Sequence, residues 1–319
     1  MKSLNLTRIV MGIIVIAGLL FFKPLAYFAG AMMIFAGLTG VCFLEKLLSK
    51  VFSSGVSCSI SLAGPISNDL QNMTPEQIKR VVKEKYSEVA SNAQGKFNFP
   101  VGRKFAESVG YPGELLDKLP VSMWESFTGA GNPQPYIDIK HGEKILDLGC
   151  GAGLDLYLYA QATGPEGQVY GLDISDEMIS KARRNMETLN VRNAEFFCAA
   201  ADSIPLPDGS VDLVAVNGIY NLSPDKNAVM REVVRVLRPG GRTIFAEIVL
   251  KAPLPEEIRK NINDWFRCIG GALPQNDFLE SLKSSGFDNP RILSTGRNAR
   301  TGHKLALCAV VEAEKRNPR

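Results

Sequence analysis

The 319-residue sequence predicts an α/β fold, a doubly wound and mostly parallel seven-stranded sheet preceded by a transmembrane helical hairpin. Three observations predict it. Apolar runs of strand length alternate with segments of helical period from residue 144 to residue 249, which is typical of a parallel sheet with helices on both faces. A glycine-rich segment follows the first run directly. Two long apolar runs without charges lie near the amino terminus.

Residues 9–22 and 25–44 form these two apolar runs. The second has the length of a membrane-spanning helix, and the first approaches it if the aliphatic stem of Arg8 extends it. A cleaved signal peptide is the alternative for the first run alone. Basic residues flank the pair on both outer sides, so the positive-inside rule places both ends in the cytoplasm. We therefore expect a multi-pass membrane protein, held in the membrane through residues 9–44, with its globular domain in the cytoplasm.

The run TGVCFLEKLL, residues 39–48, resembles a small family of two-helix inner-membrane modules, although Phe43 stands where that family usually has proline. This resemblance implies a bacterial inner-membrane location and no defined chemistry. The following segment is small, polar and punctuated by glycine and proline, which is typical of a linker. The predicted organisation is a helical hairpin over residues 1–50, a linker over 51–72 and a globular domain over 73–319.

Composition limits the classes of function. The net charge of +3 is small and no long basic run occurs, so a nucleic-acid partner is not expected. The six cysteines are scattered without a CxxC pair or a spacing typical of zinc sites. This usage indicates a reducing compartment rather than a disulfide framework, and no metal site is predicted.

The globular domain begins with a helix whose start is marked by Thr74, Pro75 and Gln77, a capping box with proline in the first turn. The helical pattern continues through Ala90, and a short helix is expected near Glu114. Strands are predicted at residues 144–149, 168–174, 194–199, 211–217 and 242–249, with helices at 154–163, 176–189, 225–237 and 276–285. The last two runs, RILST and HKLALCAVVEA, are predicted to form an antiparallel pair at the sheet edge.

Ligands of parallel sheets bind beyond the carboxyl ends of the strands, and three acidic residues stand there. Asp147 precedes the loop of residues 149–153, whose glycines allow a ligand to approach the backbone closely. Asp173 ends the second strand, where a carboxylate can hold both hydroxyls of a ribose, and Asp202 follows the third. The loop lacks the fuller cradle that a pyrophosphate needs. A nucleoside with a charged amino-acid tail, S-adenosylmethionine, therefore fits better than a dinucleotide.

The segments ILDLGCGAG, VYGLDIS, DSIPLPDGSVDLV and VVRVLRPGGR resemble the successive motifs of class I S-adenosylmethionine-dependent methyltransferases over about residues 142–248. The resemblance implies a Rossmann-like fold, S-adenosylmethionine as cofactor and a methyl-transferring enzyme. It implies that the loop lines the methionine tail, that Asp173 binds ribose and that Asp202 flanks adenine. The cofactor-binding residues expected are Asp147, Gly149, Cys150, Gly151, Gly153, Asp173, Ile174, Ala201, Asp202 and Asn217.

Segments on both sides of this core, among them VVKEKYSEVA, FAESVGYPGELLDKLP and WFRCIGGAL, resemble the arsenite methyltransferase family. That family binds trivalent arsenic through cysteine thiolates, soft ligands that suit a soft ion. The resemblance places one of these cysteines at Cys268. In the family patterns GCGNP and SNCVINL, however, this chain has Ala130 and Gly218 in place of cysteine. The cysteine pair that often follows the first helix is absent as well.

The two replacements predict a smaller and more apolar acceptor pocket. A domain tethered to a membrane can also receive a lipophilic molecule from the bilayer. The leading hypothesis is therefore methyl transfer to a small, hydrophobic or membrane-derived acceptor, such as a quinone or a lipid. Four aromatic residues are candidates for the pocket wall: Phe127, Tyr220, Trp265 and Phe266.

Transfer of a methyl group from a sulfonium is an in-line displacement, which needs mainly alignment and exclusion of water. An oxygen or carbon acceptor must also lose a proton. The candidate catalytic residues are Asn217, Tyr220, Glu247 and Cys268. Two alternatives stay open: an arsenite (metalloid) methyltransferase with an incomplete cysteine set, and a non-catalytic membrane module that binds S-adenosylmethionine.

Overall fold

The computed structural model describes residues 69–317. The predicted membrane hairpin, including residues 9–44, and most of the predicted linker lie outside these residues. Among residues 69–317, no helix is long and apolar enough to cross a membrane.

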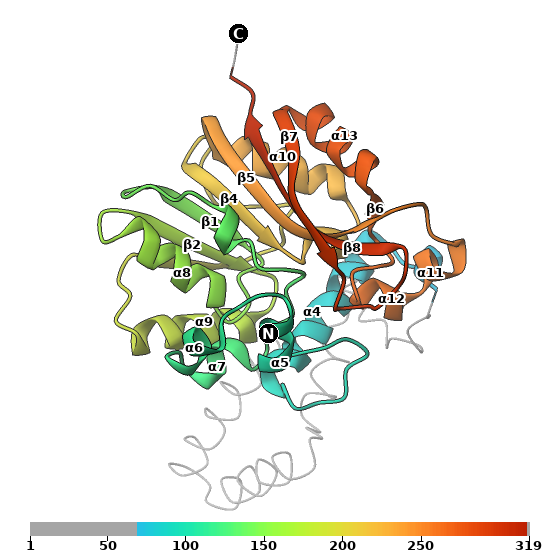
Figure 1. Ribbon diagram of the computed structural model, residues 1–319, viewed down its shortest axis with the longest axis horizontal. Helices are drawn as coiled ribbons and strands as arrows, with labels where there is room; N and C mark the ends of the chain where they lie inside the picture. The colour runs from blue at the N-terminus through green and yellow to red at the C-terminus, as the bar shows by residue number, and fades with distance from the viewer. Residues whose placement is uncertain (1–68, 318–319) are drawn as a thin grey trace, which may run out of the picture. The chain divides into compact units, whose positions relative to one another are not determined.

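One mixed sheet forms the centre of the described part of the chain (Figure 1). Its strands lie in the order β3-β2-β1-β4-β5-β8-β7, and the first five are parallel. The predicted antiparallel pair at one edge is confirmed, because β8 runs antiparallel to both β5 and β7. A short parallel strand, β6, pairs with β5 and was not predicted. The strands are β1 Lys144–Leu148, β2 Gln168–Asp173, β3 Ala194–Cys198, β4 Val211–Asn217, β5 Leu237–Leu250, β6 Leu273–Pro274, β7 Phe287–Arg297 and β8 Ala306–Lys315.

The long helix at the start of the domain begins at a side-chain cap. Thr74 accepts a hydrogen bond from the backbone of Gln77 and donates its own N–H to the Gln77 side chain, which confirms the predicted capping box. The α-helices are α4 Pro75–Ser91, α5 Arg103–Ser108, α6 Gly113–Asp117, α7 Val121–Trp124, α8 Leu154–Thr163, α9 Asp176–Thr188, α10 Lys226–Val236, α11 Glu256–Lys260, α12 Ile262–Phe266 and α13 Gln275–Ser285. Residues 69–317 also form three short 3-10 helices: η1 Leu70–Asn72, η2 Gln134–Tyr136 and η3 Tyr220–Leu222.

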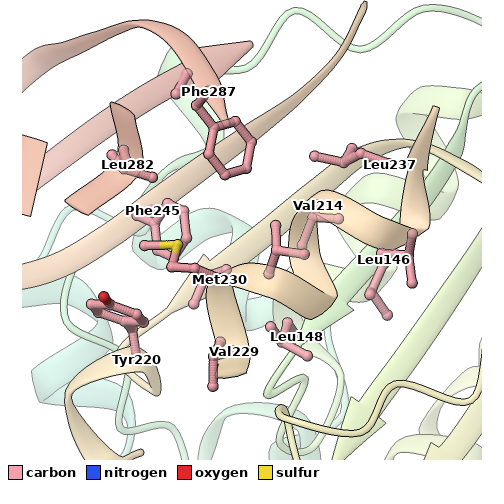
Figure 2. Packing of buried hydrophobic residues seen from close by; sticks show 14 of the residues in the cluster. Leu146, Leu148, Val214, Tyr220, Val229, Met230, Leu237, Phe245, Leu282 and Phe287 are labelled. Atoms are coloured by element: carbon pink, nitrogen blue, oxygen red, sulfur yellow. The ribbon is translucent and has the colours of Figure 1, made fainter. Parts of the chain in front are cut away.

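The central strand β1 is buried on both faces, as its alternate side chains show. Leu146 and Leu148 of β1 lie in a buried cluster with Val229 and Met230 of α10 (Figure 2). Ile145, which points to the opposite face, lies in a second cluster with residues of α8 and α9. Parallel strands with both faces covered have near-continuous apolar sequences. This is the reason why the sequence predicted these strands well.

A third buried cluster holds α4 against the rest of the domain. It contains Val82 and Val89 of α4 together with Phe266 of α12 and Ile248 of β5. Polar contacts also join α4 to α9, because Lys83 donates to Asp176 at 2.6 Å. Helix α4 therefore packs beside the carboxyl ends of the strands, where ligands of such sheets bind.

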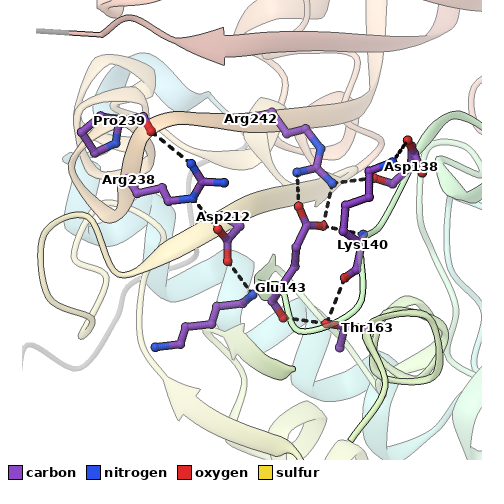
Figure 3. Close-up of polar contacts among 9 residues, drawn as sticks. Asp138, Lys140, Glu143, Thr163, Asp212, Arg238, Pro239 and Arg242 are labelled. Carbon is purple, nitrogen blue, oxygen red and sulfur yellow. Dashed lines mark hydrogen bonds and ion pairs between the residues drawn. The ribbon is translucent and has the colours of Figure 1, made fainter. Parts of the chain in front are cut away.

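At the opposite side of the sheet, where the parallel strands begin, ion pairs connect the strands (Figure 3). Arg242 of β5 donates from both terminal nitrogens to the carboxylate of Glu143, at 2.6 and 2.8 Å, and also to the backbone oxygen of Asp138. Asp212 accepts from the backbone N–H of Lys144 at 2.7 Å. These bonds hold β1, β4 and β5 together at the end that carries no predicted site residue.

Candidate functional site

The glycine loop after β1 bends back toward the sheet and faces the end of β4. Gly149 has a φ of +88°, and a Cβ there would lie 2.3 Å from a methyl carbon of Ile219, so only glycine fits. Gly151 donates its N–H to Asp173 at 3.0 Å, which ties the loop to the end of β2. Gly153 has a φ of +91° and begins α8, packed against Met186. Gly149 and Gly151 both line the cavity described below.

Asp147 carries an unsatisfied carboxylate beneath this loop. Its Oδ2 atom is buried without a hydrogen-bond partner. Burial, together with the neighbouring carboxylates of Asp155 and Asp173, raises the pKa of Asp147 well above its ordinary value. A buried acceptor of this kind needs a donor, preferably a cationic one. The ammonium group of a methionine tail supplies both properties.

A cavity of about 560 Å³ surrounds this carboxylate, and we call it the β1 cavity. Three sides come from β1 and its loop, from the end of β4 and from the segment 123–129. The lining includes predicted residues Asp147, Gly149, Cys150, Gly151, Asp173 and Asn217, and unpredicted residues Met123, Ser126, Thr128, Met178 and Ile219. The Cys150 thiol is buried, which raises its pKa well above the ordinary value, so it contributes as a neutral wall group.

A second cavity of about 630 Å³, the β2–β3 cavity, lies at the ends of β2 and β3. Its lining includes Ile174 and residues 199–202, which contain the predicted Ala201 and Asp202. The two cavities share lining residues, among them Tyr86 and Gly149, so they form one continuous cleft. Together the two cavities fit an elongated ligand that has a flat nucleobase at one end and a charged tail at the other.

Asp173 stands where the two cavities meet. It accepts from the N–H of Gly151 and, at 2.9 Å, from that of Ser175. Burial raises its pKa to about 6, although these backbone donors oppose the shift. A carboxylate has about four acceptor positions, so it can accept from ribose hydroxyls as well.

Asn217, predicted to be catalytic, lines the β1 cavity but uses its amide to hold a loop. Its Oδ1 accepts from the N–H groups of Ala130 and Gly131, at 2.8 and 3.2 Å. Its Nδ2 donates to the backbone oxygen of Gly131 and to Asp155, both at 2.9 Å. The contacts of Asn217 fix residues 130 and 131 beside the cavity.

Glu247 and Tyr220 lie behind the cleft and are absent from the lining of both cavities. The Tyr220 ring packs in the core against Phe245 and Phe278. Glu247 is 1% exposed and accepts from the backbone N–H of Tyr220 at 2.7 Å and from Asn221 at 3.1 Å. Burial raises its pKa to about 7. Through these hydrogen bonds, Glu247 holds η3 at the end of β4.

The three positions at which the arsenite methyltransferase patterns carry cysteine do come together. Cys268 donates its thiol to the backbone oxygen of Gly218 at 3.2 Å. A Cβ on Gly218 would lie 2.9 Å from the backbone nitrogen of Ala130, and Gly218 has a φ of +80°. Cys268 is fully buried, and burial raises its pKa to about 11, so the group is a thiol and not a thiolate at neutral pH. Only one sulfur therefore remains among these three positions.

Of the four aromatic residues predicted to line the acceptor pocket, Phe127 lines the β1 cavity. Trp265 instead donates its indole N–H to the backbone of Leu222 at 3.0 Å, and Phe266 is buried in the core. Sequence reasoning missed Tyr86, whose ring lines both cavities from α4. The only sequence signal for Tyr86 was its place four residues after the buried Val82 on one helix face.

Known proteins that are similar in sequence to this chain include methyltransferases. A family profile described as a methyltransferase domain matches residues 139–286. The chain is 33% identical over 248 residues to an arsenite methyltransferase of Halobacterium salinarum, covering 72% of this chain and 63% of that protein. It is 36% identical over 186 residues to an arsenite methyltransferase of Aquipseudomonas alcaligenes, covering 56% and 53%.

A solved structure has a similar fold. The crystal structure of an arsenic(III) S-adenosylmethionine methyltransferase from Chlamydomonas reinhardtii matches with a TM-score of 0.54 at 28% identity, covering 67% of this chain and 73% of that one. The chain spans less than two thirds of the length of the two curated relatives. The matched residues 139–286 contain β1 to β4 and their loops, which form part of the cleft described above. Tyr86 and the segment 123–129, which also line the cleft, lie before the matched residues.

Proposed function

Since residues 139–286 form a class I S-adenosylmethionine-dependent methyltransferase domain, we propose that the chain transfers a methyl group to a small, hydrophobic acceptor. The predictions of S-adenosylmethionine as cofactor and of an enzyme of this class are confirmed. The acceptor and the place of the reaction at a membrane are the parts that we propose.

The residues present fit the cofactor. S-adenosylmethionine supplies an electrophilic methyl group on a sulfonium, so the protein has only to bind and align the reactants. Asp147 would hold the ammonium of the methionine tail, because its buried oxygen lacks a donor. Asp173 would hold the ribose and Asp202 the adenine, since both line the β2–β3 cavity. The apolar walls of the cleft exclude water from the reacting methyl group.

One observation carries the choice of acceptor. Of the three cysteine positions of the arsenite methyltransferase patterns, only Cys268 carries sulfur, and the backbone of Ala130 occupies the space that a side chain at Gly218 would need. At these three positions, a soft ion that requires several thiolates would therefore find a single sulfur. The side chains of Tyr86, Phe127 and Ile219 line the β1 cavity beside its polar residues and give an acceptor an apolar surface to contact.

The predicted membrane hairpin adds to this proposal. A catalytic domain that is tethered beside a bilayer meets lipophilic molecules at high local concentration. We propose that the acceptor is such a molecule, a quinone, a lipid or another hydrophobic metabolite. An acceptor oxygen or carbon would give up its proton on methylation. Asn217 would act by fixing the loop of Ala130 and Gly131 beside the acceptor.

Arsenite methylation is the second candidate function, favoured by the two curated relatives and by the retained Cys268. A label-transfer assay separates the two. Full-length protein in detergent is incubated with methyl-labelled S-adenosylmethionine and either a lipid extract of the source cell or arsenite with reduced thiol. Label in the organic phase supports the hydrophobic acceptor. Label in water-soluble methylarsenicals, lost in Cys268→Ser, would replace it by the arsenite function.

The control variant for this assay is Asp147→Asn, which should bind cofactor weakly and transfer label to neither phase. If the wild-type chain binds S-adenosylhomocysteine tightly but labels no acceptor in any extract, the chain is a cofactor-binding module and the proposed activity is wrong.

A further inference from the structure

An ion pair spans the β2–β3 cavity from a part of the chain outside the methyltransferase match. Lys79 of α4 pairs through its ammonium with Oδ2 of Asp202, which follows β3. Both residues line the cavity. The Asp202 side chain is only 11% exposed and that of Lys79 28%, so the pair is shielded more than most surface ion pairs.

In this ion pair, the two carboxylate oxygens of Asp202 have different surroundings. Lys79 contacts Oδ2, which leaves Oδ1 for a second donor. An ionised carboxylate only accepts hydrogen bonds. The exocyclic amino group of an adenine is a donor, whereas the oxygen at the same position of hypoxanthine is an acceptor. A carboxylate fixed at this edge of the cavity therefore distinguishes the two bases.

We propose that Lys79 is a positioning residue, which holds the Asp202 carboxylate in the orientation that recognises the amino group of the cofactor's adenine. This inference rests on the assignment of the β2–β3 cavity to the adenosine. It extends the cofactor site to helix α4, which lies before residues 139–286 and is attached to the domain through its own apolar face.

The same helix supplies a matched control. Lys83, one turn after Lys79, forms a similar ion pair with Asp176 at 2.6 Å. It joins α4 to α9, as Lys79 joins α4 to the loop after β3, but it lines neither cavity. If these lysines only attach α4 to the domain, their removal should have similar effects on binding.

The test is calorimetric titration of the full-length chain in detergent with S-adenosylhomocysteine and with S-inosylhomocysteine. Lys79→Met is expected to weaken binding of S-adenosylhomocysteine roughly tenfold, the scale of one charge-assisted hydrogen bond, and to reduce the preference over the inosine analogue. Lys83→Met should bind within about twofold of wild type, and Lys79→Arg should retain most of the affinity.

A double-mutant cycle shows whether Lys79 acts through Asp202. In the Asp202→Asn background, Lys79→Met should cause no further loss. Equal losses in Lys79→Met and Lys83→Met, additive losses in the cycle, or unchanged or tighter binding in Lys79→Met would each overturn the inference. Failure of the wild-type chain to bind S-adenosylhomocysteine would instead overturn the cofactor assignment. The two failures are therefore distinguishable.

Discussion

At the scale of single residues, Gly218 occupies a position where the arsenite methyltransferase patterns carry cysteine, and its surroundings leave little room for a side chain. Its φ of +80° and the 2.9 Å approach of a Cβ to the Ala130 nitrogen disfavour any side chain. We predict that Gly218→Ala lowers the free energy of unfolding by about 2–4 kcal/mol, through backbone strain and overpacking together. Urea unfolding measures this change.

The matched control for this prediction is Gly151→Ala. Gly151 also has a positive φ, +52°, but a Cβ there meets nothing within 4 Å. Its substitution should cost only the backbone strain, about 1 kcal/mol. Equal costs at the two positions would show that the approach of Ala130 does not restrict Gly218, and a cysteine could then be accommodated there.

Glu247 should make stability depend on pH. Its folded-state pKa of about 7 lies above the ordinary 4.5, because burial favours the neutral form. Its contribution to stability is therefore full below pH 4.5 and is lost as the pH rises through 7. We predict that the unfolding free energy of wild type, relative to Glu247→Gln, falls by about 2–2.5 kcal/mol between pH 5 and 7.5. Denaturant unfolding at several pH values measures this difference.

Glu232 provides the contrast. Its hydrogen bond with Arg235 lowers its pKa, so its stabilising effect is present above pH 4.5 and is lost only as the pH falls. The difference between wild type and Glu232→Gln should therefore stay constant over the same range. A flat profile for Glu247→Gln as well would mean that the Glu247 carboxylate is ionised in the folded protein at pH 5.

At the scale of elements, the ion pair between Glu143 and Arg242 joins the start of β1 to β5 (Figure 3). The two side chains are 10% and 20% exposed. Arg242→Met would leave the Glu143 carboxylate with little compensation in a poorly solvated place. We predict a loss of about 2–4 kcal/mol in unfolding free energy, measured by urea unfolding. Affinity for S-adenosylhomocysteine should stay within about twofold of wild type, because the pair lies at the opposite end of the strands from the cleft.

Arg291 on β7 makes a similar pair with Glu312, but its side chain is 69% exposed. Arg291→Met should therefore cost less than about 1 kcal/mol. If the two arginine variants lose equal stability, burial does not determine the strength of these pairs.

The elements predicted best were those with strong patterns. Strands β1 to β4 were placed within one residue, because their sequences are mostly apolar and, except in the edge strand β3, most of their side chains are buried. Helices α5, α7, α11 and α12 were missed, since they have only four to six residues and are too short to show a helical period. β5 begins at Leu237, five residues before its predicted start at residue 242. Leu237 pairs with Val211 of β4, and a register shift separates this pair from the next one, Leu213 with Arg242.

The site residues that come directly after strands in the sequence were predicted, and those on other elements were not. Asp147, Asp173 and Asp202 come directly after three apolar runs, so their meeting at one sheet edge follows from the topology. Lys79 and Tyr86 reach the same cleft from a helix that precedes β1 by more than fifty residues. No local pattern indicates where such a helix docks. Their roles depend on tertiary packing, which the sequence alone did not show.

At the scale of the whole molecule, the described residues belong to a unit, Ser67–Arg319, that contains its own buried clusters. We therefore predict that a fragment of residues 67–319 folds alone, with an unfolding midpoint within a few degrees of that of the full chain. The fragment should stay in the supernatant when mixed with lipid vesicles. The full chain should sediment with the vesicles, because residues 9–22 and 25–44 are apolar and free of charge.

A full-length variant with Ile14→Arg and Phe35→Arg isolates the effect of the two apolar runs. An arginine at the centre of a membrane-spanning helix costs about 2.5–3.5 kcal/mol of insertion free energy, so this variant should insert poorly. It should still bind S-adenosylhomocysteine as the fragment does, since neither change lies in the domain of the cleft. Sedimentation and calorimetry together check both expectations. Sedimentation of the fragment itself would show that the domain binds lipid directly, and the runs would then not be needed to bring a lipophilic acceptor to the cleft.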